Sequence, residues 1–345
     1  MAILYFFIIV FILATFLPAT RIPHWFFRIP DFIRLQTLMI KGGLLLILLW
    51  FTDEYTTFTT VLLVALLICM IYQLFKIIPY TKVYPRIKKP FDSDGMVSIL
   101  AANVLQDNRE YDKFIAEVNK FDPDLVLTME SDKKWEDALG VLEERYKESI
   151  KIPMDNYYGM HLYSKVELSH ISKNFEIEDD VPSIYIEYPA DGKSIIFACM
   201  HPAPPSPTEN ETSEERDAEL MVVGRKIRHL DKSAVVCGDM NDVVWSRTTR
   251  LFRKVTGMVD PRVGRGFFST YHADYPLLRF PLDHLFHTKD LYVGTMKRTE
   301  NFGSDHFGMY YEIHYKYNSE VPENPKLTNG DKKEIEDLID SPNED

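Results

Sequence analysis

The stretch VVCGDMND, residues 235–242, places a carboxylate and a carboxamide at the end of an apolar, β-branched run. Side chains alternate along a strand, so Asp239 and Asn241 are expected on one face while Met240 turns to the other. A charge at the end of a buried strand must be paired, solvated or used. The spacing therefore predicts that Asp239 and Asn241 meet one object together.

Polar side chains of the same kind lie at the ends of other strand-like runs. They are Asn103, Glu130, His201, Asp283, Asp305 and His306. Each of them alone has an ordinary structural explanation, such as a turn, a cap or a hydrogen-bonded histidine. In α/β proteins, however, strand ends converge on one edge of the sheet, where ligands bind. The set therefore predicts one site assembled from several strands.

Alternating runs of β-type and α-type residues must position these side chains. Strand-like runs span 96–105, 124–130, 159–165, 183–189, 194–200, 233–239, 282–288 and 308–315. Helix-like runs span 110–120, 132–146, 213–230 and 246–255. The pattern predicts an α/β domain over residues 96–317, preceded by a polar, proline-containing linker at 81–95. The tail 318–345 is rich in Pro, Asn and acidic residues and is expected to be disordered.

The blocks AANVL, TMES, MHPAP, GDMND, PLDHLF and GSDHFGM, in this order, resemble the endonuclease/exonuclease/phosphatase superfamily over about residues 95–316. The GD-x-N and SDH blocks are the most specific part of the resemblance. It implies a four-layer sandwich, in which two packed, mostly antiparallel sheets are flanked by helices, and metal-dependent hydrolysis of phosphate esters. Two departures are visible: Met129 stands where the family often has Gln, and SDHFGM lacks the Pro that often follows the SDH block.

The resemblance also implies a role for each residue at the strand ends. Glu130 would be the main Mg²⁺ ligand, with Asn103 and Asp305 beside the metal, and Mn²⁺ is the alternative ion. Asp283 would orient His306, Asp239 would position or deprotonate water or assist the leaving group, and Asn241 and His201 would contact non-bridging phosphate oxygens. The residue types suit these roles, because hard cations take oxygen ligands and an Asp–His pair handles protons.

The first 80 residues predict a multi-pass anchor in the cell membrane. Uncharged or nearly uncharged apolar runs at 2–17, about 36–52 and about 58–75 each approach the length that spans a bilayer as a helix. For the first run, the alternative is a cleaved signal peptide.

Lys and Arg gather after the first and third apolar runs, and none lies in the turn between the second and third. This distribution favours a catalytic domain on the cytoplasmic side. The extracytoplasmic side is the alternative, which an architectural similarity to bacterial glycopeptide-resistance proteins would imply.

Charge and composition bear on the substrate. The chain has a net charge of −12, and residues 1–80 hold five basic and three acidic residues, so the rest carries −14. Such an acidic domain fits poorly with binding along a nucleic-acid backbone. The segment 262–280 offers Arg262, Arg265 and Tyr271 as candidate substrate contacts, with ordinary packing as the alternative. The proline-rich run 201–209 is either a rim loop over the cleft or a plain rigid turn.

The leading hypothesis is a membrane-anchored, Mg²⁺-dependent phosphoesterase that acts on a lipid-linked or small phosphorylated substrate. An endonuclease or exonuclease is the first alternative, with nucleic acid as a less favoured partner than lipid. An inactive membrane scaffold that keeps the fold is the second. Beyond the substrate and the bilayer, the sequence gives no basis for inferring a protein partner.

Overall fold

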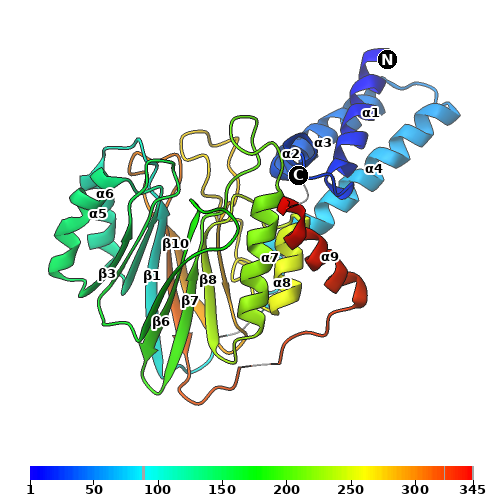
Figure 1. Ribbon diagram of the computed structural model, residues 1–345. Coiled ribbons are helices and arrows are strands. Elements are labelled where there is room, and N and C mark those ends of the chain that lie inside the picture. Colours follow the sequence, from blue (N-terminus) through cyan, green and yellow to red (C-terminus); the bar gives the residue numbers. More distant parts are fainter. Residues whose placement is uncertain (88–89, 322, 344–345) are drawn as a thin grey trace.

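The computed structural model describes residues 1–87, 90–321 and 323–343, and Figure 1 shows the arrangement of its elements. The N-terminal helices are α1 (Ala2–Phe16), η1 (Leu17–Ala19), α2 (Trp25–Phe32), α3 (Arg34–Phe51), α4 (Thr57–Ile77) and η2 (Ile78–Tyr80). The following helices are α5 (Tyr111–Phe121), α6 (Lys133–Ala138), η3 (Leu139–Glu144), α7 (Glu214–Arg228), α8 (Arg247–Thr256), α9 (Asn329–Asp340) and η4 (Ser341–Asn343). The strands are β1 (Gly95–Asn103), β2 (Leu125–Met129), β3 (Glu148–Ile152), β4 (Met160–Ser164), β5 (His170–Phe175), β6 (Pro182–Ala190), β7 (Lys193–Cys199), β8 (Ser233–Asp239), β9 (Asp283–His287), β10 (Tyr292–Arg298) and β11 (Met309–Tyr315).

Two mixed sheets pack face to face. One has the strand order β10-β11-β1-β2-β4-β3 and the other has the order β5-β6-β7-β8-β9. Neighbouring strands are antiparallel, except for the parallel pairs β1–β2 and β7–β8. The side chains between the sheets form one apolar core, which includes Ile99, Leu127, Phe197, Val235 and Tyr311.

Helices cover the outer face of each sheet, which completes four layers (Figure 1). α5 and α6 pack over the six-stranded sheet through a second apolar cluster, and α7, α8 and α9 pack over the five-stranded sheet through a third. In β8, Val235 and Cys237 face the core between the sheets, whereas Ala234 and Val236 face the helices. Because β8 is buried on both faces, its sequence is a continuous apolar run. The predicted α/β sandwich is confirmed, although β3, β5, β10 and α2 were not expected.

The C-terminal tail corrects one prediction. Residues 329–340, expected to be disordered, form α9, whose N-terminus carries a capping box between Thr328 and Asp331. Ile335 is 4% exposed and packs with Leu338 and Ile339 against the cluster under α7 and α8. This helix has little signal in the sequence, because its apolar side chains are few and the acidic residues around them are typical of disordered segments.

Three N-terminal helices are long and apolar enough to cross a membrane, namely those over Ala2–Ala19, Arg34–Phe51 and Thr57–Tyr80. α1, α3 and α4 pack together through an apolar cluster and extend away from the sandwich (Figure 1). Inside this bundle, Nζ of Lys41 donates to Oγ1 of Thr15, 2.5 Å away. The Lys41 side chain is buried in the bundle interior.

The short helix α2 fixes this bundle to the sandwich. The backbone N–H of Trp25 donates to the Glu211 carbonyl oxygen at 2.9 Å. Nε1–H of Trp245 donates to the carbonyl oxygen of Asp31 at 2.7 Å, and the bond is buried. Arg28 of α2 lies 3.6 Å from the Asp217 carboxylate of α7. The bundle is therefore docked on the sandwich by several polar contacts, rather than tethered only through the segment 81–95.

Candidate active site

The polar residues at the strand ends converge at one edge of the sandwich. β1 ends at Asn103 and is paired in register with Met129, the residue before Glu130. β8 ends at Asp239, opposite Asp283, where β9 begins. These strand ends border a cleft of about 320 Å³. The catalytic candidates that line the cleft are Asn103, Glu130, His201, Asp239, Asn241, Asp305 and His306. Asp283 lies just behind this surface, in contact with His306.

His306 is held between two carboxylates. Its Nδ1 lies 2.9 Å from Oδ2 of Asp283, and its Nε2 lies 3.5 Å from Oδ2 of Asp239. Burial lowers the pKa of His306, but the charges of Asp239 and Asp283 outweigh it and raise the pKa to about 10. Burial raises the pKa of Asp239, yet His306 and His201 bring it below its usual value. The site therefore pairs an imidazolium with a carboxylate at neutral pH.

Glu130 is the best candidate for a metal ligand. Asn103 Nδ2–H donates to its Oε1 at 2.7 Å, and the backbone N–H of Gln106 donates to its Oε2 at 3.2 Å. Burial raises the pKa of Glu130 to about 7 despite these bonds. Among the described residues, no Lys or Arg forms an ion pair with Glu130. Glu130 is a half-buried carboxylate that lines the cleft together with a second carboxylate, that of Asp305. Two carboxylates at the mouth of one cleft, without a Lys or Arg of the described chain paired to Glu130, fit a hard divalent cation.

Asp239, Asp283 and His306 also offer one ligand atom each within 4.8 Å of one another. Both nitrogens of His306, however, already face carboxylates, so neither has a free lone pair for a metal while the ring is protonated. This group could handle protons and stabilise charge, whereas Glu130 and its neighbours could hold a metal.

Asn241 meets Asp239 through a turn and not through strand alternation. β8 ends at Asp239, and Asn241 has a left-handed backbone with φ 47°. Its N–H donates to Oδ1 of Asp239 at 3.0 Å, and its Nδ2–H donates to the Pro202 carbonyl oxygen at 3.0 Å. The predicted proximity of the two residues is found, but its predicted cause is wrong.

His201 faces the same carboxylate from the end of β7. Its Nε2 lies 4.0 Å from Oδ2 of Asp239, and burial lowers its pKa to about 4. Its Nδ1 is buried and has no hydrogen-bond partner. His201 thus lines the cleft as a neutral imidazole.

Residues 100–306, more than half of the 345-residue chain, match the model of the Endonuclease/Exonuclease/phosphatase family. The chain belongs to this family. It is accordingly a metal-dependent phosphoric ester hydrolase with the family's fold. A search of curated protein sequences finds no significant match.

Several solved structures share the fold at low sequence identity. An endonuclease/exonuclease/phosphatase from Bacteroides vulgatus is 17% identical, with a TM-score of 0.53, and the match covers 65% of this chain and 100% of that one. A second, from Beutenbergia cavernae, is 12% identical with a TM-score of 0.50, covering 64% and 72%. TDP2 of D. rerio, solved with a single-strand DNA product, is 15% identical with a TM-score of 0.52, covering 64% and 100%.

Met129, which replaces the Gln often found in this family, has a structural role here. Its side chain is fully buried, and its Sδ accepts the backbone N–H of Asp239 at 3.1 Å. This contact links the end of β2 in one sheet to the end of β8 in the other. Met129 therefore joins the two strand ends that carry Glu130 and Asp239.

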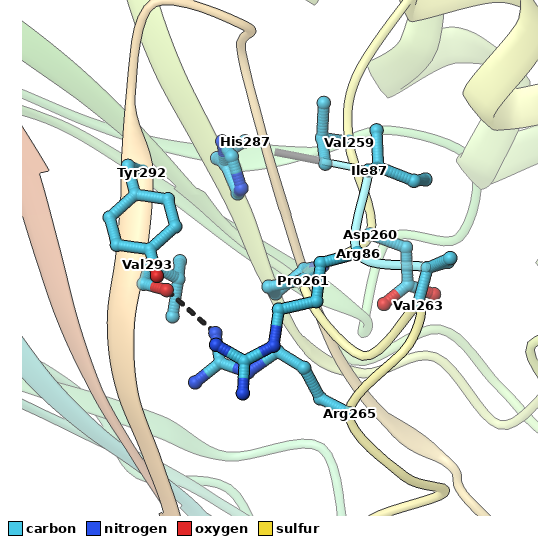
Figure 2. Close-up of a pocket in the computed structure, with 10 residues that line it drawn as sticks. All are labelled: Arg86, Ile87, Val259, Asp260, Pro261, Val263, Arg265, His287, Tyr292 and Val293. Atoms are coloured by element: carbon cyan, nitrogen blue, oxygen red, sulfur yellow. Dashed lines mark hydrogen bonds between the residues drawn. The ribbon is translucent and has the colours of Figure 1, made fainter. Parts of the chain in front are cut away.

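Two candidate substrate contacts are not in the cleft. Arg262 is 1% exposed, and its Nε–H donates to Oδ1 of Asp260 at 2.9 Å. Arg265 donates to the carbonyl oxygens of Val293 and Gly294, each at 2.6 Å, and lies in a separate pocket (Figure 2). The prediction was wrong for both arginines, because each guanidinium group donates its hydrogen bonds to protein groups outside the cleft. Tyr271 does line the cleft, with its ring 4.9 Å from that of His306.

Several cleft residues have no signal in the sequence. Gln106 supports Glu130 through its backbone and lies three residues beyond a strand end. Phe32, in the segment between two apolar runs, lines the same cleft as His306 although 274 positions separate them. The tyrosines Tyr157 and Tyr158 also line it. The proline-rich run is a rim loop, since Pro204, Pro205, Ser206, Thr208 and Glu209 border the cleft.

Proposed function

We propose that this protein is a membrane-anchored, Mg²⁺-dependent phosphoesterase that hydrolyses a phosphate ester of a membrane lipid. The observation that carries the proposal is the composition of the cleft wall. Among the described residues, no Lys or Arg lines the cleft, whereas Phe32, Tyr271, Phe280 and Leu282 form an apolar side. A site for a polyanionic nucleic acid would be expected to present basic side chains along the backbone path.

The anchor also contributes to the wall of the cleft. Phe32 ends α2, two residues before the candidate span that begins at Arg34, and its ring packs edge-to-face on Phe280 with centroids 6.1 Å apart. A substrate in this cleft therefore touches the segment that the membrane helices hold in place. This arrangement supports a substrate located at the bilayer and not one in bulk solvent.

The side chains support in-line attack of water on phosphorus, in which a new P–O bond forms while the ester P–O bond breaks. The lipid leaves as an alcohol after taking up a proton from water. Asp239, kept ionised by the positive charge of His306, accepts the proton of the attacking water. His306, oriented by Asp283, is positively charged and stabilises the negative charge that develops on the phosphoryl oxygens. Asn241 and the neutral His201 supply further polar contacts to those oxygens. A divalent cation held by Glu130, with Asn103 and Asp305 beside it, would polarise the phosphoryl group.

Hydrolysis by the full-length protein across a substrate panel tests this proposal. The panel contains a phosphate monoester lipid, a pyrophosphate lipid and a phosphodiester lipid in vesicles, with plasmid DNA and RNA as the nucleic-acid arms. We expect one lipid to be hydrolysed with Mg²⁺, and hydrolysis to stop when EDTA is added. His306→Gln is the inactive control, and the exposed His170→Gln on β5 is its matched control. Cleavage of DNA or RNA without lipid hydrolysis would overturn the proposal in favour of a nuclease.

A further inference from the structure

A short loop beside the cleft exposes apolar side chains that no part of the described chain covers. The loop joins the cleft residues Tyr271 and Phe280, and its tip has the sequence YPLL. Tyr275 is 58% exposed, Leu277 is 83% exposed and Leu278 is 50% exposed. Scattered exposed leucines are ordinary on a surface, but a contiguous apolar tip marks a contact site.

The tip lies against the first turn of a candidate membrane span. Nε2–H of Gln36, in the first turn of α3, donates to the carbonyl oxygen of Leu277 at 2.8 Å. One turn further along α3, Met39 is 77% exposed and Ile40 is 46% exposed. The apolar surface of the loop is therefore continuous with the surface that α3 would present to lipid.

The base of the same loop lies at the catalytic centre. Tyr271 and Phe280 pair across the loop, and both line the cleft. The backbone N–H of Ala273 donates to the carbonyl oxygen of Asp305 at 2.6 Å. Phe280 and Leu277 are three residues apart, so base and tip are separated by about 10 Å at most. The headgroup region of one leaflet is about 5–8 Å thick, so the cleft mouth lies close to headgroup height.

α2 holds the loop at this height and adds to the same surface. Its polar contacts to Glu211, Asp217 and Trp245 are directed toward the sandwich. Phe26, 53% exposed, and Ile29, 40% exposed, are directed away from it. Aromatic and aliphatic side chains on a helix that joins two spans are typical of the membrane interface.

We infer that the loop tip Tyr275–Leu278 and the exposed face of α2 form one interfacial surface, which inserts into the leaflet next to the catalytic domain. The cleft then opens along the membrane surface. Phe32 and Phe280 form the side through which a phosphorylated lipid enters, with its acyl or prenyl chain remaining in the bilayer. The inference rests on the membrane anchor and lipid substrate proposed above, and its occupant is the bilayer rather than another protein.

A fluorescent reporter at the loop tip tests the insertion without any measurement of activity. The full-length Leu277→Cys variant, labelled with an environment-sensitive dye, is reconstituted into vesicles with and without brominated acyl chains. The three native cysteines are buried, so the new thiol is the accessible one among the described residues. Val141→Cys, which is 51% exposed on η3 in the helical layer over the other sheet, is the matched control.

We expect emission at position 277 to shift to shorter wavelength and to be quenched by brominated lipid, while position 141 reports water. An unquenched, water-like spectrum at position 277 would overturn the inference. Hydrolysis is measured on the same vesicles. Quenching without hydrolysis of any lipid would contradict the proposed function and leave the interfacial surface established.

A second variant connects the surface to the substrate. Leu277→Asp together with Leu278→Asp should lower hydrolysis of lipid in vesicles at least about tenfold relative to hydrolysis of a water-soluble phosphate ester, since each leucine loses its burial in the membrane. Val141→Asp should leave that ratio unchanged. Equal loss on both substrates would contradict a role in reaching the bilayer.

Discussion

Nδ1 of His306 lies 2.9 Å from Oδ2 of Asp283, and this contact decides which edge of the imidazole faces the cleft. The two residues come from opposite sides of the sandwich: Asp283 begins β9 in one sheet, and His306 precedes β11 in the other. The pair can form only when both sheets are packed. Catalytic competence and correct packing of the sandwich are therefore linked in this molecule.

Replacing either member of the pair should reduce turnover by different amounts. His306→Gln removes the charge that faces the phosphoryl oxygens, and we expect kcat to fall about 10²–10⁴-fold. Asp283→Asn keeps the imidazole but weakens its orientation, so the loss should be smaller. Steady-state kinetics on the substrate found in the panel checks both values. Near-normal turnover by His306→Gln would rule out the assigned role.

Glu130 should control the requirement for metal. Glu130→Gln keeps the shape of the side chain and removes its charge. We therefore expect the Mg²⁺ concentration for half-maximal activity to rise about 10–100-fold. Titration of activity with free Mg²⁺ after treatment with chelator measures this shift. The exposed Glu167→Gln is the matched control and should titrate like the unmodified protein. An unchanged titration for Glu130→Gln would place the metal elsewhere.

Gly238 should not tolerate a side chain. It has φ 142°, and a Cβ at this position would lie 1.9 Å from the carbonyl oxygen of Met200. Gly238→Ala must displace the end of β7 from β8, so a loss of more than about 4 kcal/mol is expected. Gly140→Ala, where no atom lies within 4 Å of the new Cβ, should be nearly neutral. Thermal unfolding of both purified variants tests the contrast, and similar melting temperatures would refute it.

The pattern of runs predicted an α/β domain with a polar site at its strand ends for a physical reason, whereas the sandwich was implied by the resemblance to the family. Strands buried on both faces are visible as apolar runs, and the polar residues that end them, such as Asp239 and His306, stand out against that background. The contacts of Arg262 and Phe32 depended on packing between segments far apart in the chain. No local sequence pattern indicates that Arg262 pairs with Asp260. Likewise, no local pattern indicates that α2 packs against Phe280.

Glu219 should make the stability of the domain fall as pH rises. It is 2% exposed on α7, and Oγ–H of Ser183 donates to its Oε1 at 2.9 Å. Burial raises its pKa to about 8, whereas the unfolded value is about 4.3. Between these values the folded state keeps a proton that the unfolded state has lost, so unfolding becomes easier as pH increases.

The Glu219→Gln variant should remove this dependence. Its melting temperature should exceed that of the unmodified protein by a margin that grows from pH 5 to pH 8. Each kcal/mol of difference in the free energy of unfolding should correspond to about 2–4 °C. Thermal unfolding at several pH values measures the margin, and the exposed Glu144→Gln serves as the matched control. A margin that stays constant or shrinks between pH 5 and pH 8 would show that Glu219 is ionised in the folded protein.

The most direct measurement is a competition between the two substrate classes in one reaction. Full-length protein is incubated with Mg²⁺, vesicles containing the phosphorylated lipid and single-stranded DNA, at equal concentrations of phosphate. Mass spectrometry follows the lipid, and electrophoresis follows the DNA. We predict that the lipid loses its phosphate group while the DNA remains intact. Degradation of the DNA before the lipid would contradict the assignment of this cleft to a membrane substrate.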